Sequence, residues 1–325
     1  MQIEKLLELL NATINETSKE SEIQNATVYL KKVDEGSLFI SNDEEEIKEA
    51  LSSGAKAILY DSDLTITDPN IAWIKVNDIQ SAAFKITEYV VSDEDASFYY
   101  LNSREITFFK MIALYQRDAE YLGDDWRKVF EKVLNSRKKL FIGSDIDLMK
   151  KLRPKVKILK REVDGYIISD TLFRTTFRIG KYVYQYKQFS PIHIEQLLRT
   201  IAFCEDTNQE YSLERVRYFN GFMPLFIEGE PSLNEYSKNN RIVIVCDNLA
   251  DISRARDYAK LPSGWVVKTA VLTPPKTKID GVQKPIYYRN HDDILDILQG
   301  SNFNYAFIYS DDVNVINMIK KEYNI

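Results

Sequence analysis

The chain has 325 residues, with 43 Lys and Arg against 49 Asp and Glu, and a net charge of −6. This acidic balance argues against a nucleic-acid-binding module, whose surface is usually basic. The cysteine count of 2 excludes a disulfide framework and a multi-cysteine metal site. No apolar run approaches the roughly 18–20 residues of a membrane helix, and the N-terminal stretch carries acidic residues inside its apolar repeat, unlike a signal peptide. We therefore expect a cytoplasmic protein of two or three domains, with no membrane span and no nucleic-acid partner.

The first 95 residues alternate between predicted helices and strands. In chain order these are a helix over 3–10, strands over 27–33 and 36–41, a helix over 42–55, strands over 56–61 and 72–76, and a helix over 79–91. The helix that begins at 42 has an acidic first turn, which suits the positive end of a helix dipole. This order of elements favours an α/β layer.

An acidic stretch at 92–97 is typical of a hinge and opens a middle segment. Its predicted elements are a strand, a short loop and a long helix within 98–122, a helix over 124–137, a strand over 138–145, a helix over 146–152, a β-rich run over 156–189, and helices over 191–207 and 212–220. The β-rich run alternates in polarity and turns at Asp164-Gly165 and Ile179-Gly180.

The polar segment 228–240 contains Gly, Pro and Ser and is typical of a linker. An α/β pattern starts again after it. The predicted elements are a strand over 241–247, a helix over 250–261, strands over 265–274 and 285–289, a helix over 291–299, a strand over 305–311 and a helix over 313–323.

Three blocks of sequence resemble the Mur ligases of peptidoglycan synthesis. The first is "KKVDEGSLFIS" with "EEIKEALSSGAKAILYD" and "IAWIKVNDIQSAAFKITEYV", the second "FYYLNSREITFFKMIALY", and the third "FSPIHIEQLLRTIAFCED" with "SLERVRYFNGF". The resemblance implies an α/β fold in three domains: an N-terminal Mur-ligase-like domain over 1–95, a truncated central domain with a degenerate P-loop region over 96–235, and a C-terminal Rossmann-like domain over 236–325. A complete ligase is longer, and the shortfall falls near 115–170.

The second block occupies the position of the family's phosphate loop, which binds ATP. It contains no Gly that would let backbone N–H groups close around a phosphate, and Ile106 stands where the family has a Lys before Thr107. Glu105 would set a negative charge against the phosphates, and Thr107 alone matches the hydroxyl that would hold magnesium. These residues also fit a plain connection between a strand and a helix.

The family's other signatures are similarly reduced. His193 stands at the His of the family's G-x-H-N motif, but Ile194 and Leu197 replace the asparagines on the adenine side. His193 also fits a helix start that packs on a sheet. The segment 29–31 replaces the D-S-R that touches uridine in the family. The resemblance therefore implies no catalytic residue and no metal ligand, and it leaves a remnant nucleotide site whose residues are Asn102, Ser103, Arg104, Thr107, Lys110 and His193.

Two further groups have plain structural interpretations. Cys204 lies in an apolar helix and Cys246 in an apolar strand, so both are expected to be small buried hydrophobic residues. The basic stretch at 135–161 fits a solvated face, with an anionic partner as the alternative.

The resulting hypothesis is a degenerate, catalytically inactive Mur-ligase homologue. It would need no cofactor and would bind a cell-wall synthesis protein or a UDP-sugar precursor as a scaffold or binding protein. The alternative is an active ATP-dependent amide ligase with a rearranged nucleotide site, where ATP and magnesium bind and Lys110 or Arg104 supplies the charge that faces the phosphates. A third interpretation is that the likeness is accidental, and that a multi-domain α/β protein carries a ligand cleft at the carboxyl ends of its strands.

Overall fold

The computed structural model describes residues 1–14, 22–65, 68–92, 96–115, 118–159, 163–228, 240–260, 266–282 and 284–325. The chain folds into two compact units. Unit 1 comprises Met1–Ile106 and Tyr115–Lys160, and unit 2 comprises Thr107–Leu114 and Arg161–Ile325. Most of the predicted hinge and linker (residues 93–95 and 229–239) lies outside the described residues. The division into three domains at 95 and 235 stays a prediction.

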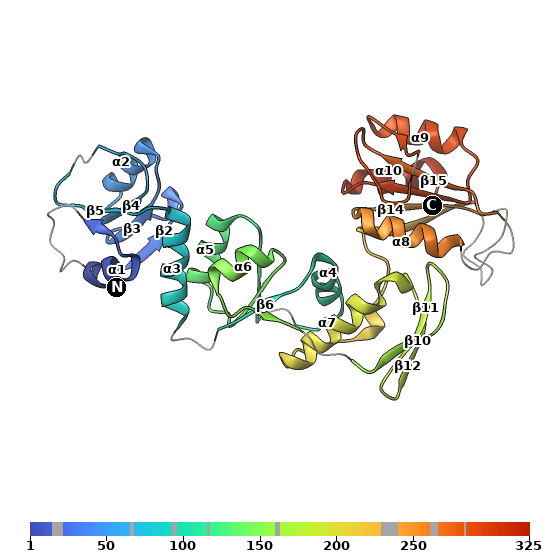
Figure 1. The fold of residues 1–325 in the computed structure, drawn as a ribbon, viewed down its shortest axis with the longest axis horizontal. Coiled ribbons are helices and arrows are strands. Elements are labelled where there is room, and N and C mark those ends of the chain that lie inside the picture. The colour runs from blue at the N-terminus through green and yellow to red at the C-terminus, as the bar shows by residue number, and fades with distance from the viewer. Residues whose placement is uncertain are drawn as a thin grey trace. The chain divides into compact units, whose positions relative to one another are not determined.

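A five-stranded sheet of order β1-β5-β4-β3-β2 opens unit 1, and only β1 runs antiparallel to its neighbour. Its elements are α1 (Ile3–Leu10), β1 (Thr13–Ile14), β2 (Asn25–Thr27), η1 (Leu30–Lys32), β3 (Ser37–Ile40), α2 (Glu44–Ser52), β4 (Ala57–Tyr60), β5 (Ala72–Lys75) and α3 (Ile79–Ser92). Alternate strand residues face opposite ways. Leu38 and Leu59 therefore pack with α1 and α3, whereas Phe39 and Ile58 pack with α2 (Figure 1).

The predicted strand over 27–33 is wrong beyond its first residue. β2 ends at Thr27, and Leu30–Lys32 forms a 3-10 turn. The backbone N–H of Val28 donates to the carboxylate of Glu131, 2.8 Å away, instead of to a neighbouring strand. A contact with a residue more than a hundred positions away ends this strand, and no local pattern announces it.

The second sheet of unit 1 has four parallel strands in the order β7-β8-β6-β9. The elements of this part of the chain are β6 (Ser97–Tyr100), α4 (Ser103–Ile112), β7 (Ala119–Leu122), α5 (Trp126–Asn135), β8 (Leu140–Gly143), α6 (Ile146–Leu152) and β9 (Lys157–Ile158). The predicted long helix is too long, because α4 ends at Ile112 and Ala119–Leu122 pairs with β8 as a strand. Helix α4 also passes from unit 1 into unit 2 after Ile106.

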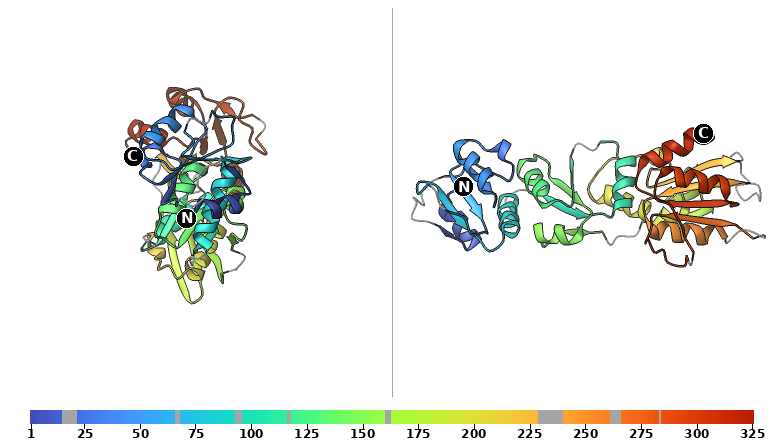
Figure 2. Two further views of the ribbon diagram at one scale, coloured as in Figure 1. Left: turned by 90° about the vertical axis from the view of Figure 1, so that its left-hand side faces the viewer. Right: turned by 90° about the horizontal axis from the view of Figure 1, so that it is seen from above.

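Unit 2 holds two sheets, β10-β11-β12 and β13-β14-β17-β15-β16. Its elements are β10 (Gly165–Asp170), β11 (Thr175–Ile179), β12 (Tyr182–Lys187), η2 (Pro191–His193), α7 (Ile194–Asp206), η3 (Leu213–Arg215), β13 (Phe222–Glu228), β14 (Arg241–Cys246), α8 (Leu249–Lys260), β15 (Thr269–Thr273), β16 (Ile286–Tyr287), α9 (His291–Gly300), β17 (Tyr305–Tyr309) and α10 (Val313–Tyr323). Helices α9 and α10 cover one face of the second sheet and α8 the other (Figures 1 and 2).

Two predictions in this region need correction. The predicted helix over 212–220 is only the 3-10 turn Leu213–Arg215. The strand β13 was not predicted; it pairs antiparallel with β14, with a register shift between Phe226 and Glu228. The mixed α/β class itself, with parallel sheets between helices, is confirmed.

Candidate functional site

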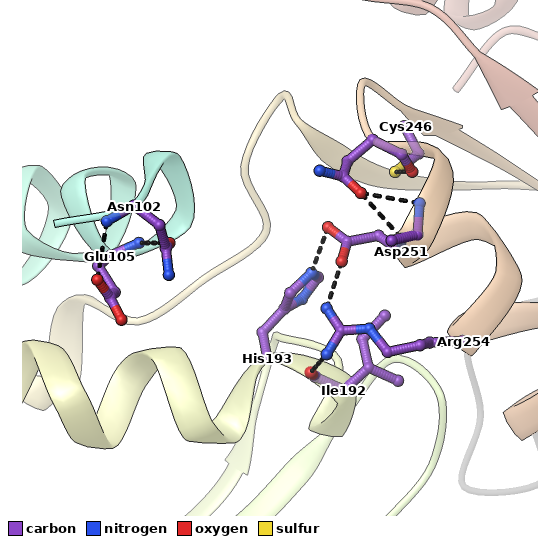
Figure 3. Close-up of polar contacts among 9 residues, drawn as sticks. Asn102, Glu105, Ile192, His193, Cys246, Asp251 and Arg254 are labelled. Atoms are coloured by element: carbon purple, nitrogen blue, oxygen red, sulfur yellow. Dashed lines mark hydrogen bonds and ion pairs between the residues drawn. The ribbon is translucent and has the colours of Figure 1, made fainter. Parts of the chain in front are cut away.

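Helix α4 starts with a reciprocal pair of hydrogen bonds. The backbone N–H of Glu105 donates to Oδ1 of Asn102 over 2.9 Å, and the backbone N–H of Asn102 donates to the Glu105 carboxylate over 2.8 Å (Figure 3). This arrangement is a capping box, which satisfies backbone groups at a helix start with side chains three residues apart. Side chains of this turn therefore already accept hydrogen bonds from two of the backbone N–H groups at the start of α4.

The side chains of this turn differ in exposure. Glu105 and Arg104 are buried, with 1% and 6% of their surface exposed, whereas Ser103 is exposed. A helix start attracts anions because its N–H groups and dipole point outward. Here a carboxylate of the chain already lies against that end.

The six residues of the predicted nucleotide site do not all belong to one unit. Asn102, Ser103 and Arg104 belong to unit 1, whereas Thr107, Lys110 and His193 belong to unit 2.

Thr107 and Lys110 line an open cleft of about 680 Å³ in unit 2. They are one helical turn apart, so their side chains lie on the same face of α4. The opposite wall is the segment 215–220, which contributes Arg215 and Arg217. The remaining described residues of the lining are Met111, Tyr218, Phe219 and Asn220.

His193 does not line this cleft. Its side chain is fully buried, and its Nε2 lies 3.1 Å from Oδ2 of Asp251, whose side chain is 3% exposed (Figure 3). The ring also packs edge-on against Phe219 and Phe222, with centroids 5.4 and 5.0 Å apart. This placement is that of a histidine in the packed interior of unit 2.

Asp251 joins two segments that are far apart in the sequence. Its second oxygen forms an ion pair with Arg254, one turn further along α8, and Arg254 donates to the backbone carbonyl of Ile192 over 3.2 Å (Figure 3). Asn248 caps the start of α8 and accepts from the backbone N–H groups of Ala250 and Asp251. The carboxylate thus binds η2 to α8.

A second buried carboxylate lies beside the segment 29–31. Glu131 of α5 is 4% exposed and accepts hydrogen bonds from the backbone of Val28, the hydroxyl of Thr27 and the ammonium of Lys32. All of these residues belong to unit 1. The Glu131 carboxylate therefore contacts residues on both sides of the segment 29–31, where the sequence lacks the family's D-S-R.

Both cysteines are buried, as the sequence predicted. Burial, with a smaller effect of Glu205, raises the pKa of Cys204 from 9.0 to about 12. The Sγ of Cys246 donates to the backbone carbonyl of Asn248. A thiol needs a lowered pKa and access to solvent to act as a nucleophile, and Cys204 has neither.

Within the described residues, no cluster of three or more His, Cys, Asp or Glu side chains could hold a metal ion. The same part of the chain contains no helix with the length and apolar character that crossing a membrane requires.

No protein-family model and no curated protein matches the sequence. The structure, by contrast, is similar to crystal structures of MurF. One from Acinetobacter baumannii aligns over 100% of this chain and 99% of its own, with 10% identity and a TM-score of 0.54. A MurF ligase from Thermotoga maritima in complex with ADP aligns over 94% and 98%, with 11% identity and a TM-score of 0.56.

At such low identity the likeness concerns the fold alone, and the fold is that of the MurF ligases. The resemblance to Mur ligases that three sequence blocks predicted is therefore confirmed at this level. An accidental likeness is contradicted, because the alignment to the Acinetobacter protein spans essentially the whole of both chains.

Several of the residues that shape these sites were not predicted from the sequence. Arg215 and Arg217 lay within the predicted helix over 212–220, and two arginines two residues apart were the local signal of a cationic surface there. Glu131 and Asp251 gave no signal, because each is one acidic residue among many on an amphipathic helix.

Proposed function

We propose that this chain is a cytoplasmic protein of Mur-ligase fold that acts by binding and does not carry out ATP-driven ligation. The proposal includes the three domains 1–95, 96–235 and 236–325 and a role as a scaffold or binding protein linked to peptidoglycan synthesis. The observation that carries it is the capping box of Asn102 and Glu105 at the start of α4.

A phosphate loop needs backbone N–H groups that point at the ligand and a cation that neutralises it. Here Asn102 accepts from one such N–H group, and the Glu105 carboxylate accepts from another. A nucleotide phosphate at this helix start would meet the negative charge of Glu105, and Ile106 stands where the family has a lysine. The residues 102–107 therefore do not fit the triphosphate of ATP.

The loop at 27–32 supports the same proposal. Glu131 binds the backbone and side chains of this loop, so a further anion there would face a buried carboxylate. Binding of a UDP-sugar at this place would need that carboxylate to give up its partners.

Assays with the full chain test the proposal. ATP, magnesium, UDP-muramoyl tripeptide and D-alanyl-D-alanine are supplied together, and release of ADP and formation of amide product are measured. We expect neither above the rate without protein. Turnover that the variant Thr107→Ala abolishes would contradict the proposal.

Calorimetric titration with UDP-muramoyl tripeptide then separates the two proposed partners. Micromolar binding assigns the precursor as the ligand. An absence of binding at millimolar precursor would leave a cell-wall synthesis protein as the proposed partner.

One observation favours the alternative, an active ligase with a rearranged nucleotide site. Thr107 and Lys110 line one cleft together with two arginines, so cationic groups do lie near the family's magnesium-binding hydroxyl. Arg104, the other cation considered for this role, is almost fully buried. The ADP-release assay with Thr107→Ala distinguishes the alternative from the proposal.

A further inference from the structure

Strands β10, β11 and β12 form an antiparallel sheet in unit 2 (Figure 1), and one face of this sheet is open. The strand pairings place Tyr166, Arg178 and Val183 opposite one another in one row across the sheet. Residues in one row share a face, and the next row along the strands points the other way. Phe177 belongs to that next row; it is buried and packs edge-on against Phe189, with centroids 5.6 Å apart. The first row therefore lies on the face turned away from the core, which we name the open face.

The open face and the adjoining edge strand expose large apolar side chains. Tyr166 and Ile168 of β10, and Tyr182, Val183 and Tyr186 of β12, are each between 48% and 60% exposed. Exposed hydrophobic side chains are ordinarily scattered singly over a surface, whereas a contiguous group marks an interaction site. Tyrosine is also enriched where proteins contact each other. The group therefore has the composition of a protein-binding surface.

A positive charge lies at the middle of the open face. The Arg178 guanidinium lies over the ring of Tyr166, 6.0 Å from its centroid, and donates to the Tyr166 hydroxyl over 3.3 Å and to the carbonyl of Gly180 over 2.6 Å. These partners are neutral, and Asp164, an exposed residue two positions before Tyr166, forms no ion pair with Arg178. The charge of Arg178 is therefore not compensated by a carboxylate within the described part of unit 2.

This charge limits what can cover the open face. Any partner that docks there removes Arg178 from water. Burying a charge is costly unless an opposite charge is brought to it, and a carboxylate fits a guanidinium with two parallel hydrogen bonds. The occupant therefore has to carry an acidic side chain, with apolar side chains around it that contact Tyr166, Ile168 and Val183.

Two other occupants fit the open face less well. A second copy of the chain, docked about a two-fold axis through the middle of the face, would bring its own Arg178 against this one, so like charges would meet. A nucleic acid is bound through many phosphate contacts, whereas this surface offers Arg178 and Lys181 in a chain whose net charge is −6.

We propose that the open face of the sheet β10-β11-β12 docks an acidic segment of another protein. A carboxylate of this segment bonds to Arg178, and its aliphatic side chains pack on Tyr166, Ile168 and Val183. The inference rests on the proposed role as a scaffold and deepens it, since it gives the chemistry of the protein partner.

Calorimetric titration of the full chain tests the proposal with short capped peptides. The probes are a peptide that alternates Glu and Leu, one that alternates Lys and Leu, one that alternates Glu and Ser, and single-stranded oligothymidylate. We expect the Glu-Leu peptide to bind most tightly, because it alone brings both the carboxylates and the apolar side chains. The Glu-Ser peptide should bind more weakly, and the Lys-Leu peptide and the oligothymidylate should not bind.

Two variants locate the binding of the Glu-Leu peptide. Arg178→Gln should weaken it about tenfold, since a hydrogen bond between charged groups is lost, and Ile168→Ser by a similar factor through lost apolar contact. Arg289→Gln and Val313→Ser change exposed residues in other parts of unit 2 and should leave the affinity unchanged. Thermal melting of each variant checks that the fold is intact.

Absence of Glu-Leu binding at millimolar peptide, equal binding of the Lys-Leu peptide, tighter binding of oligothymidylate, or binding that neither variant of the open face weakens overturns the inference. Self-association in sedimentation that Ile168→Ser abolishes assigns the face to a second copy and overturns it as well. Its failure is distinct from failure of the proposed function, which is contradicted by turnover in the ADP-release assay.

Discussion

Both thiols of the chain lie inside unit 2, Cys204 in α7 and Cys246 in β14. The native protein should therefore resist alkylation by iodoacetamide at about pH 8, because the thiolate is the reacting form and burial suppresses it. Mass spectrometry after a short exposure measures the reaction, with the urea-unfolded chain as the control in which both thiols react. Rapid labelling of Cys204 in the native protein would contradict the assignment of an inert thiol.

The same thiol makes stability depend on pH in the alkaline range. Its pKa is about 12 in the folded chain and 9.0 ordinarily. The folded state binds the Cys204 proton more tightly than the unfolded state. The thiol's contribution to the free energy of unfolding is therefore complete below about pH 9 and is lost as the pH rises toward about 12. Urea midpoints that fall over this range in the wild type, and fall less in Cys204→Ala, would agree with this sign.

Asp251 supplies a second residue-scale prediction. Asp251→Asn removes a buried charge that pairs with Arg254 and lies beside His193. Because the Arg254 side chain is 44% exposed, the loss of these charged hydrogen bonds should cost about 2 kcal/mol, and the melting temperature should fall by a few degrees. Asp296→Asn, an exposed change on α9, is the matched control and should have little effect. Equal melting temperatures for the two variants would show that the buried cluster contributes nothing.

At the scale of elements, the capping box makes α4 depend on one side chain. Asn102→Ala removes the acceptor for the N–H of Glu105 and should lower the unfolding free energy by about 1 kcal/mol. Asn317→Ala, in the exposed middle of α10, should be neutral or slightly stabilising, since alanine favours helix. Urea denaturation measures both. Equal effects would mean that the cap has no special role.

Local pattern predicted those elements whose stability comes from their own apolar face. α1, α5 and α10 have strong amphipathic spacing, and each lies within a few residues of its predicted bounds. The elements that were missed depend on partners. β7 and β13 are strands because they pair with β8 and β14, and these pairings are not visible in a window of ten residues.

The candidate site divides in the same way, into local features that the sequence predicted and distant contacts that it did not. The sequence located α4 and the unusual residues at its start, because the absence of glycine and lysine is a local fact. The spacing of Asn102 and Glu105 is the local signature of a capping box, but the sequence could not show that Lys110 and Arg217 line one cleft. Their backbones are more than a hundred residues apart along the chain, and only the fold joins them.

At the scale of the whole molecule, the two units should respond separately to mutation. Glu131→Ala leaves Lys32 and the Val28 N–H without their buried acceptor, and both belong to unit 1. Amide hydrogen exchange should therefore quicken in β2, β3 and α5, with β14 and β17 of unit 2 unchanged. Asp251→Asn should produce the reverse pattern. A uniform change across the chain in either variant would show that the units unfold as one.

The course of the chain through the two units has a consequence for how the protein can be divided genetically. The backbone leaves unit 1 after Ile106, returns after Leu114 and leaves it again after Lys160. The residues of unit 2 therefore do not form one continuous segment of the chain, and no single continuous stretch of the gene encodes unit 2 alone. A gene truncated to start at 161 would lack the segment 107–114, the later part of α4, with its buried Phe108, Phe109 and Ile112. Any fusion, split or shuffling of this gene has to carry that eight-residue insert along.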